Sequence, residues 1–255
     1  MTDIATAPES TPLKKLDAAV IATRPTRRYR ARAFQVYVLL AAVGFVVLAV
    51  VARTVPYFGI DLTITQAVQS YHGAIFDKVM FGISWIGFVP QSLFFGIVPS
   101  VLLFATGLRW EAVVSLFAAC SAGVATLTKL IVHRPRPSVD LVHVFREIPN
   151  SGFPSGHVLT LTALCGFFAF LTYTLLKPSW ERTGLMVTFS VFGVLMGLSR
   201  IYEGQHWFSD VMGAYLLGSL WLALTIWVYR WGKPRFFVHQ PVAPETPVAP
   251  AAQAT

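Results

Sequence analysis

Residues 33–52 of the chain read AFQVYVLLAAVGFVVLAVVA, twenty positions without a charged side chain. A helix of about 20 apolar residues is long enough to cross the hydrocarbon core of a bilayer. The whole chain shares this bias: of its 255 residues, 55% are hydrophobic and 13% are charged, and the mean hydropathy is +0.61. Soluble domains carry about 25% charged residues. The composition therefore excludes a disordered chain, a collagen-like chain and an ordinary soluble globule, and it predicts an integral membrane protein.

Five further apolar runs follow the first. They cover residues 79–108, 112–128, 158–176, 183–199 and 211–229. The second run is interrupted by Pro90 and Pro99. Together the six runs predict an all-α, polytopic membrane protein with six transmembrane helices.

The segment between the first two runs carries a weaker pattern. Ile64, Val68 and Tyr71 recur at i, i+4 and i+7. This spacing predicts a short interfacial helix in the first outer loop, with a plain loop as the alternative.

The distribution of lysine and arginine indicates the orientation. With the N-terminus in the cytoplasm, 13 of these residues fall on the inner side and 7 on the outer side. Cytoplasmic loops are enriched in lysine and arginine, so both termini are expected to be cytoplasmic. The first run is longer than the 7 to 15 residues of a signal peptide and follows 32 other residues, so it is expected to remain as an anchor. The net charge of +8 is then a feature of membrane topology, and no nucleic-acid partner is expected.

These patterns divide the chain into three parts. Residues 1–32 form a basic cytoplasmic segment, residues 33–230 the six-helix membrane domain, and residues 231–255 a cytoplasmic Pro/Ala-rich tail. Residues 1 to about 30 are expected to lack regular structure, and the tail, with its PVAPETPVAPA stretch, is expected to be flexible. The two cysteines, Cys120 and Cys165, lie inside apolar runs and predict no disulfide framework.

Three polar clusters interrupt this apolar background. They consist of Lys129 with Arg136-Pro137, of Pro154-Ser155-Gly156-His157, and of Ser199-Arg200 with His206 and Asp210. The topology, derived from apolar length and charge alone, places all three clusters on the outer face of the membrane.

The cations of these clusters suit a compact anion. Arginine at 136 and 200 offers a planar fork that matches phosphate oxygens, and Lys129 adds a point charge. Ser155 and Gly156 lie where a helix is expected to begin, so free backbone N–H groups and the positive end of the helix dipole are available there. A phosphate group is the predicted ligand.

The two histidines add reactive groups. His206 and Asp210 are four residues apart at the predicted start of the sixth span, so on a helix they share a face. A carboxylate that holds one imidazole nitrogen leaves the other free to attack phosphorus. His157 comes from another helix and is placed to protonate the leaving oxygen. These residues predict a two-step phosphoryl transfer through a phosphohistidine, which water then hydrolyses.

The three clusters also resemble a known signature. KLIVHRPRP (129–137), PSGH (154–157) and SRIYEGQHWFSD (199–210) are similar, in order and spacing, to the motifs of the type-2 phosphatidic acid phosphatase superfamily, the lipid phosphate phosphatases. Those motifs are Lys-six-Arg-Pro, Pro-Ser-Gly-His and Ser-Arg-five-His-three-Asp, and no motif position departs from them. The resemblance extends over residues 33–230 and favours the bacterial branch that resembles undecaprenyl-diphosphate phosphatases.

The resemblance implies roles for the motif residues. His206 would be the nucleophile, Asp210 its partner and His157 the acid, while phosphate would be bound by Lys129, Arg136, Ser155, Gly156 and Arg200. It also implies a six-helix fold with the site at the outer interface and no required metal or other cofactor. The implied substrate is a lipid mono- or diphosphate lying in the surrounding membrane lipids. Undecaprenyl diphosphate, cleaved to undecaprenyl phosphate and inorganic phosphate, is the leading candidate.

Alternatives remain open at this point. Within the same chemistry they are phosphatidylglycerophosphate or phosphatidate as substrate, or transfer of the phosphoryl group to another hydroxyl. Further alternatives are a transporter, an inactive relative, and a metal site made of His157, His206 and Asp210. The neighbouring cations argue against a metal. Other polar residues of the loops are expected to lie outside the site, namely His133, Arg134, His143, Arg146, Glu147 and Glu203.

Overall fold

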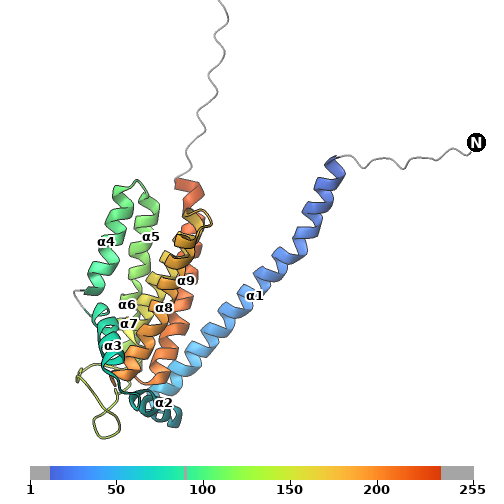
Figure 1. The fold of residues 1–255 in the computed structure, drawn as a ribbon. Coiled ribbons are helices and arrows are strands. Elements are labelled where there is room, and N and C mark those ends of the chain that lie inside the picture. Colours follow the sequence, from blue (N-terminus) through green and yellow to red (C-terminus); the bar gives the residue numbers. More distant parts are fainter. Residues whose placement is uncertain (1–11, 89–90, 237–255) are drawn as a thin grey trace, which may run out of the picture.

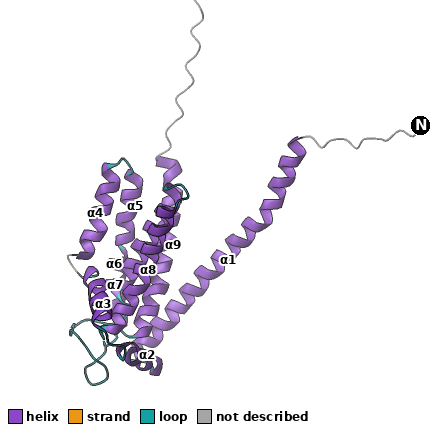
Figure 2. Ribbon diagram, viewed as in Figure 1, coloured by secondary structure: helices purple, strands orange, loops and turns teal. Residues whose placement is uncertain are grey.

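The computed structural model describes residues 12–88 and 91–236, with side chains placed from Tyr29 onward. Every regular element in this part of the chain is a helix, and none is a strand (Figure 2). The helices are α1 (Pro12–Thr54), α2 (Gly59–Gln69), α3 (Ala74–Ile86), α4 (Gln91–Ala105), α5 (Arg109–Ala119), α6 (Ser121–Val132), α7 (Gly156–Leu175), α8 (Trp180–Tyr202) and α9 (Phe208–Phe236).

Five segments within these helices are long and apolar enough to cross a membrane. They are Tyr29–Thr54, Arg109–Val132, Gly156–Leu175, Trp180–Tyr202 and Phe208–Phe236. Helices α3 and α4, which meet at an angle of 64°, add a sixth span if they are counted together. The predicted all-α, multi-span membrane fold is confirmed. The six predicted spans correspond to the higher of these two counts, and the exact number stays a prediction.

Helix α1 differs from the sequence prediction at its start. It begins at Pro12 and runs unbroken to Thr54, so residues 12–30 are helical where we expected no regular structure. This stretch is rich in alanine, lysine and arginine, which are good helix formers. No structural break marks the proposed boundary at residues 32 and 33. The predicted tail lies outside the described residues except for 231–236, which are helical.

Only one end of α1 packs on the other helices. Ala41 and Ala52 are buried, and Ala52 clusters with Val132 and Phe153. Toward its N-terminus α1 diverges from the bundle (Figure 1). Its remaining apolar side chains are largely exposed, as suits a helix whose solvent is lipid.

Helix α7 forms the centre of the bundle and is contacted by α5, α6, α8 and α9. Between membrane helices, small residues allow the close approach that gives good packing. Gly218 of α9 is such a residue, because a Cβ atom there would lie 3.0 Å from the Leu159 carbonyl oxygen. Val158 and Leu159 are completely buried. The first turn of α7 is therefore fixed firmly against α9.

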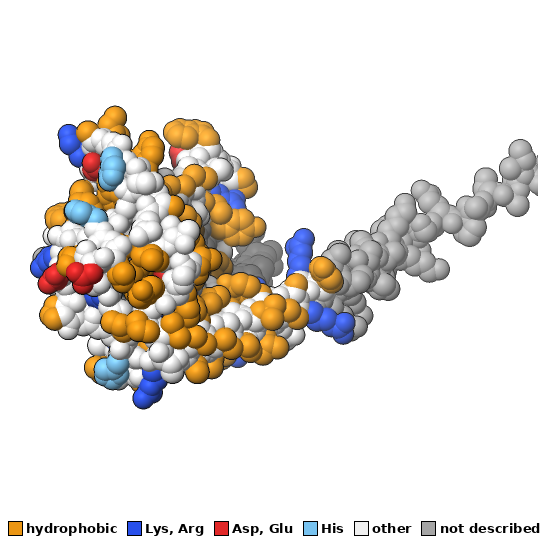
Figure 3. Space-filling view, turned by 90° about the horizontal axis from the view of Figure 1, so that it is seen from below, with side chains coloured by type: hydrophobic (Ala, Val, Ile, Leu, Met, Phe, Trp, Pro, Cys, Tyr) orange, Lys and Arg blue, Asp and Glu red, His pale blue; other side chains and the backbone are white. Residues whose placement is uncertain are grey.

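The connections that carry the polar clusters gather at one end of the bundle, which we call the loop end. It comprises α2, residues 133–155 and residues 203–207 (Figure 1). Viewed from this side, charged and histidine side chains are scattered over the bundle, whereas α1 is mostly apolar (Figure 3). The opposite end, which we call the terminal end, holds the turn at residues 106–108, the turn at 176–179 and the end of α9.

Helix α2 is present where the sequence predicted a short helix, and its most buried face is polar. Its buried residues are the polar Asp61, Thr65 and Gln69, whereas Ile64 is only half-buried and Tyr71 is exposed. The polar stripe therefore faces the protein. The position of α2 at a membrane surface stays a prediction.

Candidate active site

A cavity of about 970 Å³ opens beside the first turn of α7. Five of the eight predicted site residues line it, namely Lys129, Arg136, Gly156, His157 and His206. Ser155, Arg200 and Asp210 do not line it and are completely buried behind it. Apolar residues of three helices, α3, α6 and α7, also line the wall, including Trp85, Ala122, Leu130 and Leu164. The cavity therefore joins a cationic end to an apolar end.

His206 is held at both ring nitrogens. Its Nδ1 lies 2.8 Å from the Gly152 carbonyl oxygen, and its Nε2 lies 3.2 Å from Nη1 of Arg136. Because a carbonyl only accepts, Nδ1 must carry the proton, and Nε2 then presents its lone pair. Burial lowers the pKa of His206 well below its ordinary value, and the charges of Arg136, Lys129 and Arg200 lower it further. The imidazole is thus kept neutral, as a nucleophile requires.

Asp210 lies farther from His206 than we expected. Its Oδ2 is 3.7 Å from Nδ1 and accepts a hydrogen bond from the Trp207 backbone at 2.9 Å. The closest partner of Nδ1 is the Gly152 carbonyl instead. His206 also precedes α9, which begins at Phe208, so it lies in the connection rather than on the helix.

The start of α7 agrees with the sequence prediction. Ser155 is the N-cap residue and Gly156 the first helical residue. The backbone N–H of Ser155 donates to the Asp210 carbonyl at 3.2 Å, whereas the Ser155 hydroxyl is buried without a partner. The helix N-terminus and this free hydroxyl suit an anion.

His157 projects from the first turn of α7 into the same cavity. Its Nε2 is buried and has no hydrogen-bond partner. Its ring packs edge-on against Phe88, with centroids 5.1 Å apart. A side chain at position 87 would collide with the ring, so Gly87 makes room for it.

The three predicted cations differ in how they are held. Lys129 donates from Nζ to the Ser151 carbonyl at 2.6 Å. Arg136 donates to the Gln205 carbonyl at 2.7 Å, and burial lowers its pKa to about 10, so it stays protonated at neutral pH. The Arg200 guanidinium makes its hydrogen bonds to the described residues through Nη1. Its Nε and Nη2 are buried without partners.

Arg200 is fixed from two sides through that single nitrogen. Nη1 donates to Glu203 at 2.9 Å and to the Ser84 hydroxyl of α3. Burial raises the pKa of Glu203, and the charge of Arg200 opposes that effect. Because buried guanidinium N–H groups without a partner are costly, the Nε and Nη2 edge of Arg200 is suited to donate to an anionic acceptor.

Several loop residues lie closer to the site than we expected. His133 and Arg146 line the cavity, and Glu203 holds Arg200. Arg134 is completely buried and pairs with Asp210 at 2.7 Å. His143 does not line the cavity, and Glu147 lines an adjoining hollow of about 610 Å³.

Gly152, Gly87 and Asp61 were missed in the sequence. Gly152 contributes a backbone carbonyl and Gly87 contributes space, and neither property leaves a recognisable residue pattern. Asp61 is the one acidic residue of α2, and the apolar spacing that predicts this helix does not mark it. Among the described residues, no group of three or more His, Cys, Asp or Glu side chains is placed to hold a metal ion.

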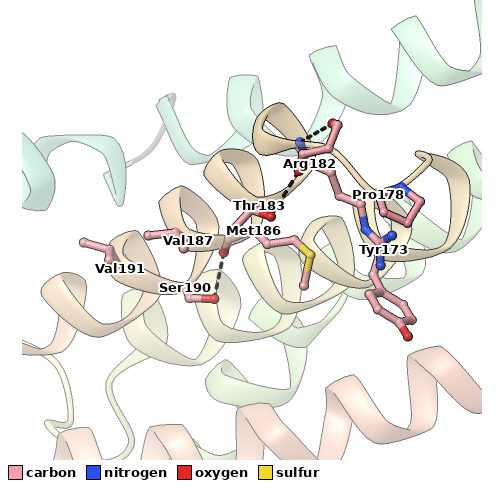
Figure 4. A pocket seen from close by; sticks show the side chains of 9 residues that line it. Tyr173, Pro178, Arg182, Thr183, Met186, Val187, Ser190 and Val191 are labelled. Atoms are coloured by element: carbon pink, nitrogen blue, oxygen red, sulfur yellow. Dashed lines mark hydrogen bonds between the residues drawn. The ribbon is translucent and has the colours of Figure 1, made fainter.

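A second hollow, between α7 and α8 at the terminal end, contrasts with this cavity (Figure 4). Its polar groups are satisfied locally. The hydroxyl of Thr183 donates to the Ser179 carbonyl at 3.1 Å, and Arg182 lies over the ring of Tyr173. The hollow therefore lacks the converging buried donors of the first cavity.

Comparison with known proteins accounts for this arrangement. Residues 110–234 match the PAP2 superfamily. The chain carries a PAP2 domain. That segment contains all three polar clusters, whereas α1, α2 and Asp61 precede it.

Individual relatives agree with this assignment. The chain is 27% identical over 187 residues to phosphatidylglycerophosphatase B of Bacillus subtilis, covering 69% of this chain and 86% of the relative. It is 31% identical over 91 residues to the undecaprenyl-diphosphatase of Sulfolobus acidocaldarius, covering 35% of this chain and 39% of that one. The crystal structure of a transmembrane PAP2-type phosphatidylglycerolphosphate phosphatase from Bacillus subtilis matches with a TM-score of 0.66 at 23% identity, over 78% of this chain and 98% of that chain. This last similarity shows the fold.

The family also confirms the predicted class of enzyme. PAP2 lipid phosphatases are hydrolases of phosphoric esters, and the named relatives are phosphatases. The PAP2 domain is accordingly a membrane-embedded phosphatase domain.

Proposed function

We propose that the chain hydrolyses a lipid mono- or diphosphate through a phosphohistidine at His206. The observation that carries this proposal is the set of buried donors left without partners around one cavity. They are the Ser155 hydroxyl, Nε2 of His157, and Nε and Nη2 of Arg200. Phosphate oxygens are acceptors with the charge and geometry to satisfy them. The neutral, Nδ1-protonated His206 completes the site.

The reaction then proceeds in two balanced steps. The Nε2 lone pair of His206 attacks the terminal phosphorus, and the bond from this phosphorus to its leaving oxygen breaks. The leaving oxygen is the ester oxygen of a lipid monophosphate or the bridging oxygen of a lipid diphosphate, and protonated His157 gives its proton to it. In the second step water attacks phosphorus while His157 takes a proton from it. The bond between phosphorus and Nε2 then breaks and inorganic phosphate leaves. The cations stabilise the charge on the phosphoryl oxygens in both steps.

The apolar end of the cavity supports a lipid as substrate. The wall formed by Trp85, Leu130 and Leu164 continues from the cationic end, so a chain can stay in apolar surroundings while its phosphate reaches His206. Undecaprenyl diphosphate remains the leading candidate of this class, because the Sulfolobus acidocaldarius relative is named an undecaprenyl-diphosphatase. Phosphatidylglycerophosphate is the second candidate, because the Bacillus subtilis relative is named phosphatidylglycerophosphatase B.

The proposal includes the orientation of the site. The predicted topology puts both termini in the cytoplasm of a cell whose inner membrane holds the protein, with the loop end facing outward. The gathering of α2 and the three polar clusters at one end of the bundle supports this arrangement. The proposed reaction requires no metal ion.

Phosphate release from the purified protein in detergent tests the proposal. A panel of lipid mono- and diphosphates, with and without an added alcohol acceptor, separates the candidate substrates and separates hydrolysis from phosphotransfer. His206→Ala is expected to lower kcat by about 10³-fold or more, because the nucleophile is lost. Wild-type enzyme denatured at alkaline pH during turnover should carry covalent phosphate that acid releases and that the variant lacks. Turnover by His206→Ala at wild-type rates would refute the phosphohistidine.

A further inference from the structure

Arg134 is a completely buried arginine that joins two carboxylates beneath the cavity. Its Nη1 donates to Asp210 at 2.7 Å, and its Nη2 donates to Asp61 at 2.9 Å. Nη1 also donates to the Ser209 hydroxyl at 2.6 Å, and Nε to the Pro56 carbonyl at 3.1 Å. A planar guanidinium is suited to such a bridge, because its donors point in fixed directions. The side chain thus fixes Asp210 at the start of α9.

The backbone of Arg134 reaches His206 by a second route. Its carbonyl accepts a hydrogen bond from the Gly152 N–H at 2.8 Å, and the Gly152 carbonyl accepts one from Nδ1 of His206 at 2.8 Å. The N–H of Arg134 donates to the Ser151 hydroxyl at 3.0 Å. One residue therefore fixes both neighbours of Nδ1, the Gly152 carbonyl and the Asp210 carboxylate.

Asp61 extends this network to α2, outside the PAP2 match. It accepts four hydrogen bonds and is completely buried. The donors are the Phe58 N–H at 3.0 Å, Nη2 of Arg134 at 2.9 Å, and the hydroxyl and N–H of Ser209 at 2.8 and 2.7 Å. The residue that follows Ser209 is Asp210, so Asp61 holds the first turn of α9 directly as well as through Arg134.

We propose that Arg134 and Asp61 are positioning residues for His206, an inference that rests on the proposed role of His206 as nucleophile. They hold the Gly152 carbonyl and Asp210 so that the proton stays on Nδ1 and Nε2 points at phosphorus. One guanidinium between two carboxylates leaves one negative charge in excess. That excess faces the imidazole, which becomes cationic when Nε2 bonds phosphorus. Helix α2 thereby belongs to the catalytic apparatus.

If Arg134 and Asp61 had a purely structural role, replacing them would leave the kcat of the folded enzyme unchanged. A buried acidic residue at the other end of the bundle offers a matched control. Glu111 of α5 is also buried, accepts a hydrogen bond from the Tyr229 hydroxyl at 2.9 Å and pairs with Lys233. This pair lies at the terminal end, away from the cavity. Glu111→Gln therefore weakens an ion pair with a buried carboxylate without touching the site.

The test compares Asp61→Asn and Arg134→Lys with Glu111→Gln in detergent. Thermal unfolding, kcat, KM and the rate of phosphohistidine formation are measured for a lipid phosphate that the wild-type enzyme hydrolyses. Asp61→Asn and Arg134→Lys are expected to lower kcat and phosphohistidine formation about 10- to 100-fold, with KM within twofold, because the nucleophile is misplaced. Glu111→Gln should retain wild-type kcat at temperatures where it is folded.

Wild-type kcat in folded Asp61→Asn and Arg134→Lys would overturn the inference, as would a change in KM alone. If neither variant folds, Ser209→Ala decides, because it removes one hydroxyl shared by both residues. A several-fold loss of kcat is then expected, and unchanged kcat would overturn the inference. His206→Ala separates the two proposals: an active His206→Ala refutes the nucleophile itself, whereas an inactive one beside an active Asp61→Asn refutes only the positioning role.

Discussion

The ring of His157 lies against the backbone of Gly87, at the point where α3 ends. Gly87 has φ −79° and ψ −12°, a conformation that alanine adopts without strain. The glycine is therefore needed for space and not for backbone freedom. Even one methyl group at this position must displace the imidazole.

We expect Gly87→Ala to lower kcat about 10- to 100-fold while the protein still folds, because a displaced His157 no longer reaches the leaving oxygen. Gly82→Ala is the matched control. Gly82 lies on the same helix, and a Cβ there meets nothing within 4 Å. Initial rates of phosphate release check the prediction, and an aryl phosphate with a good leaving group should be affected less than a lipid phosphate. Equal rates for both variants would contradict it.

At this scale, the sequence could predict those residues whose side chains carry charge or reactivity. Lys129, Arg136, His157 and His206 do line one cavity, as the clusters suggested. The sequence could not predict that Gly152 would be nearer than Asp210 to His206 Nδ1. A backbone carbonyl is present at every position, so its use depends on the three-dimensional course of the loop.

At the scale of elements, α2 connects the site to the long loop at residues 133–155. Gln69 is buried and makes three hydrogen bonds at the C-terminal end of α2. Its Nε2 donates to the carbonyls of His143 at 2.7 Å and Tyr202 at 2.9 Å, and its Oε1 accepts from the His143 N–H at 3.0 Å. Gln66, one turn earlier, is exposed and makes one longer bond, to the Leu141 carbonyl at 3.3 Å.

Gln69→Ala is expected to lower the free energy of unfolding by about 1–3 kcal/mol, because it leaves buried backbone groups without partners. Gln66→Ala should change it by less than about 0.5 kcal/mol. Hydrogen exchange locates the effect: amides in residues 141–150 should exchange faster in Gln69→Ala and at wild-type rates in Gln66→Ala. Similar exchange in the two variants would show that α2 does not hold the loop.

The sequence could predict the apolar spans because one residue pattern of sufficient length specifies each of them. It could not predict the faces of α2. Ile64 and Val68 marked a helix but not its buried face, which Asp61 and Gln69 form because their partners come from residues 134 and 143, far along the chain. The local spacing of apolar residues does not predict hydrogen bonds between residues so far apart in the sequence.

At the scale of the whole molecule, charge and apolar length place the three polar clusters on one side. The structure brings α2 and all three clusters together at the loop end, with the turn at residues 176–179 at the terminal end. The asymmetry of lysine and arginine predicts that the terminal end is cytoplasmic. Any phosphate released at the loop end would then leave on the outer side of the membrane.

Single cysteines test this orientation in intact cells. Ser138 at the loop end and Lys177 at the terminal end are both exposed. Because a charged maleimide does not cross the membrane, Ser138→Cys should react in intact cells, and Lys177→Cys should react only after permeabilisation. The wild-type chain is the control, since its Cys120 and Cys165 lie within the spans Arg109–Val132 and Gly156–Leu175. The opposite labelling pattern would place the loop end in the cytoplasm, where an enzyme at this site would act on lipid phosphates of the inner leaflet.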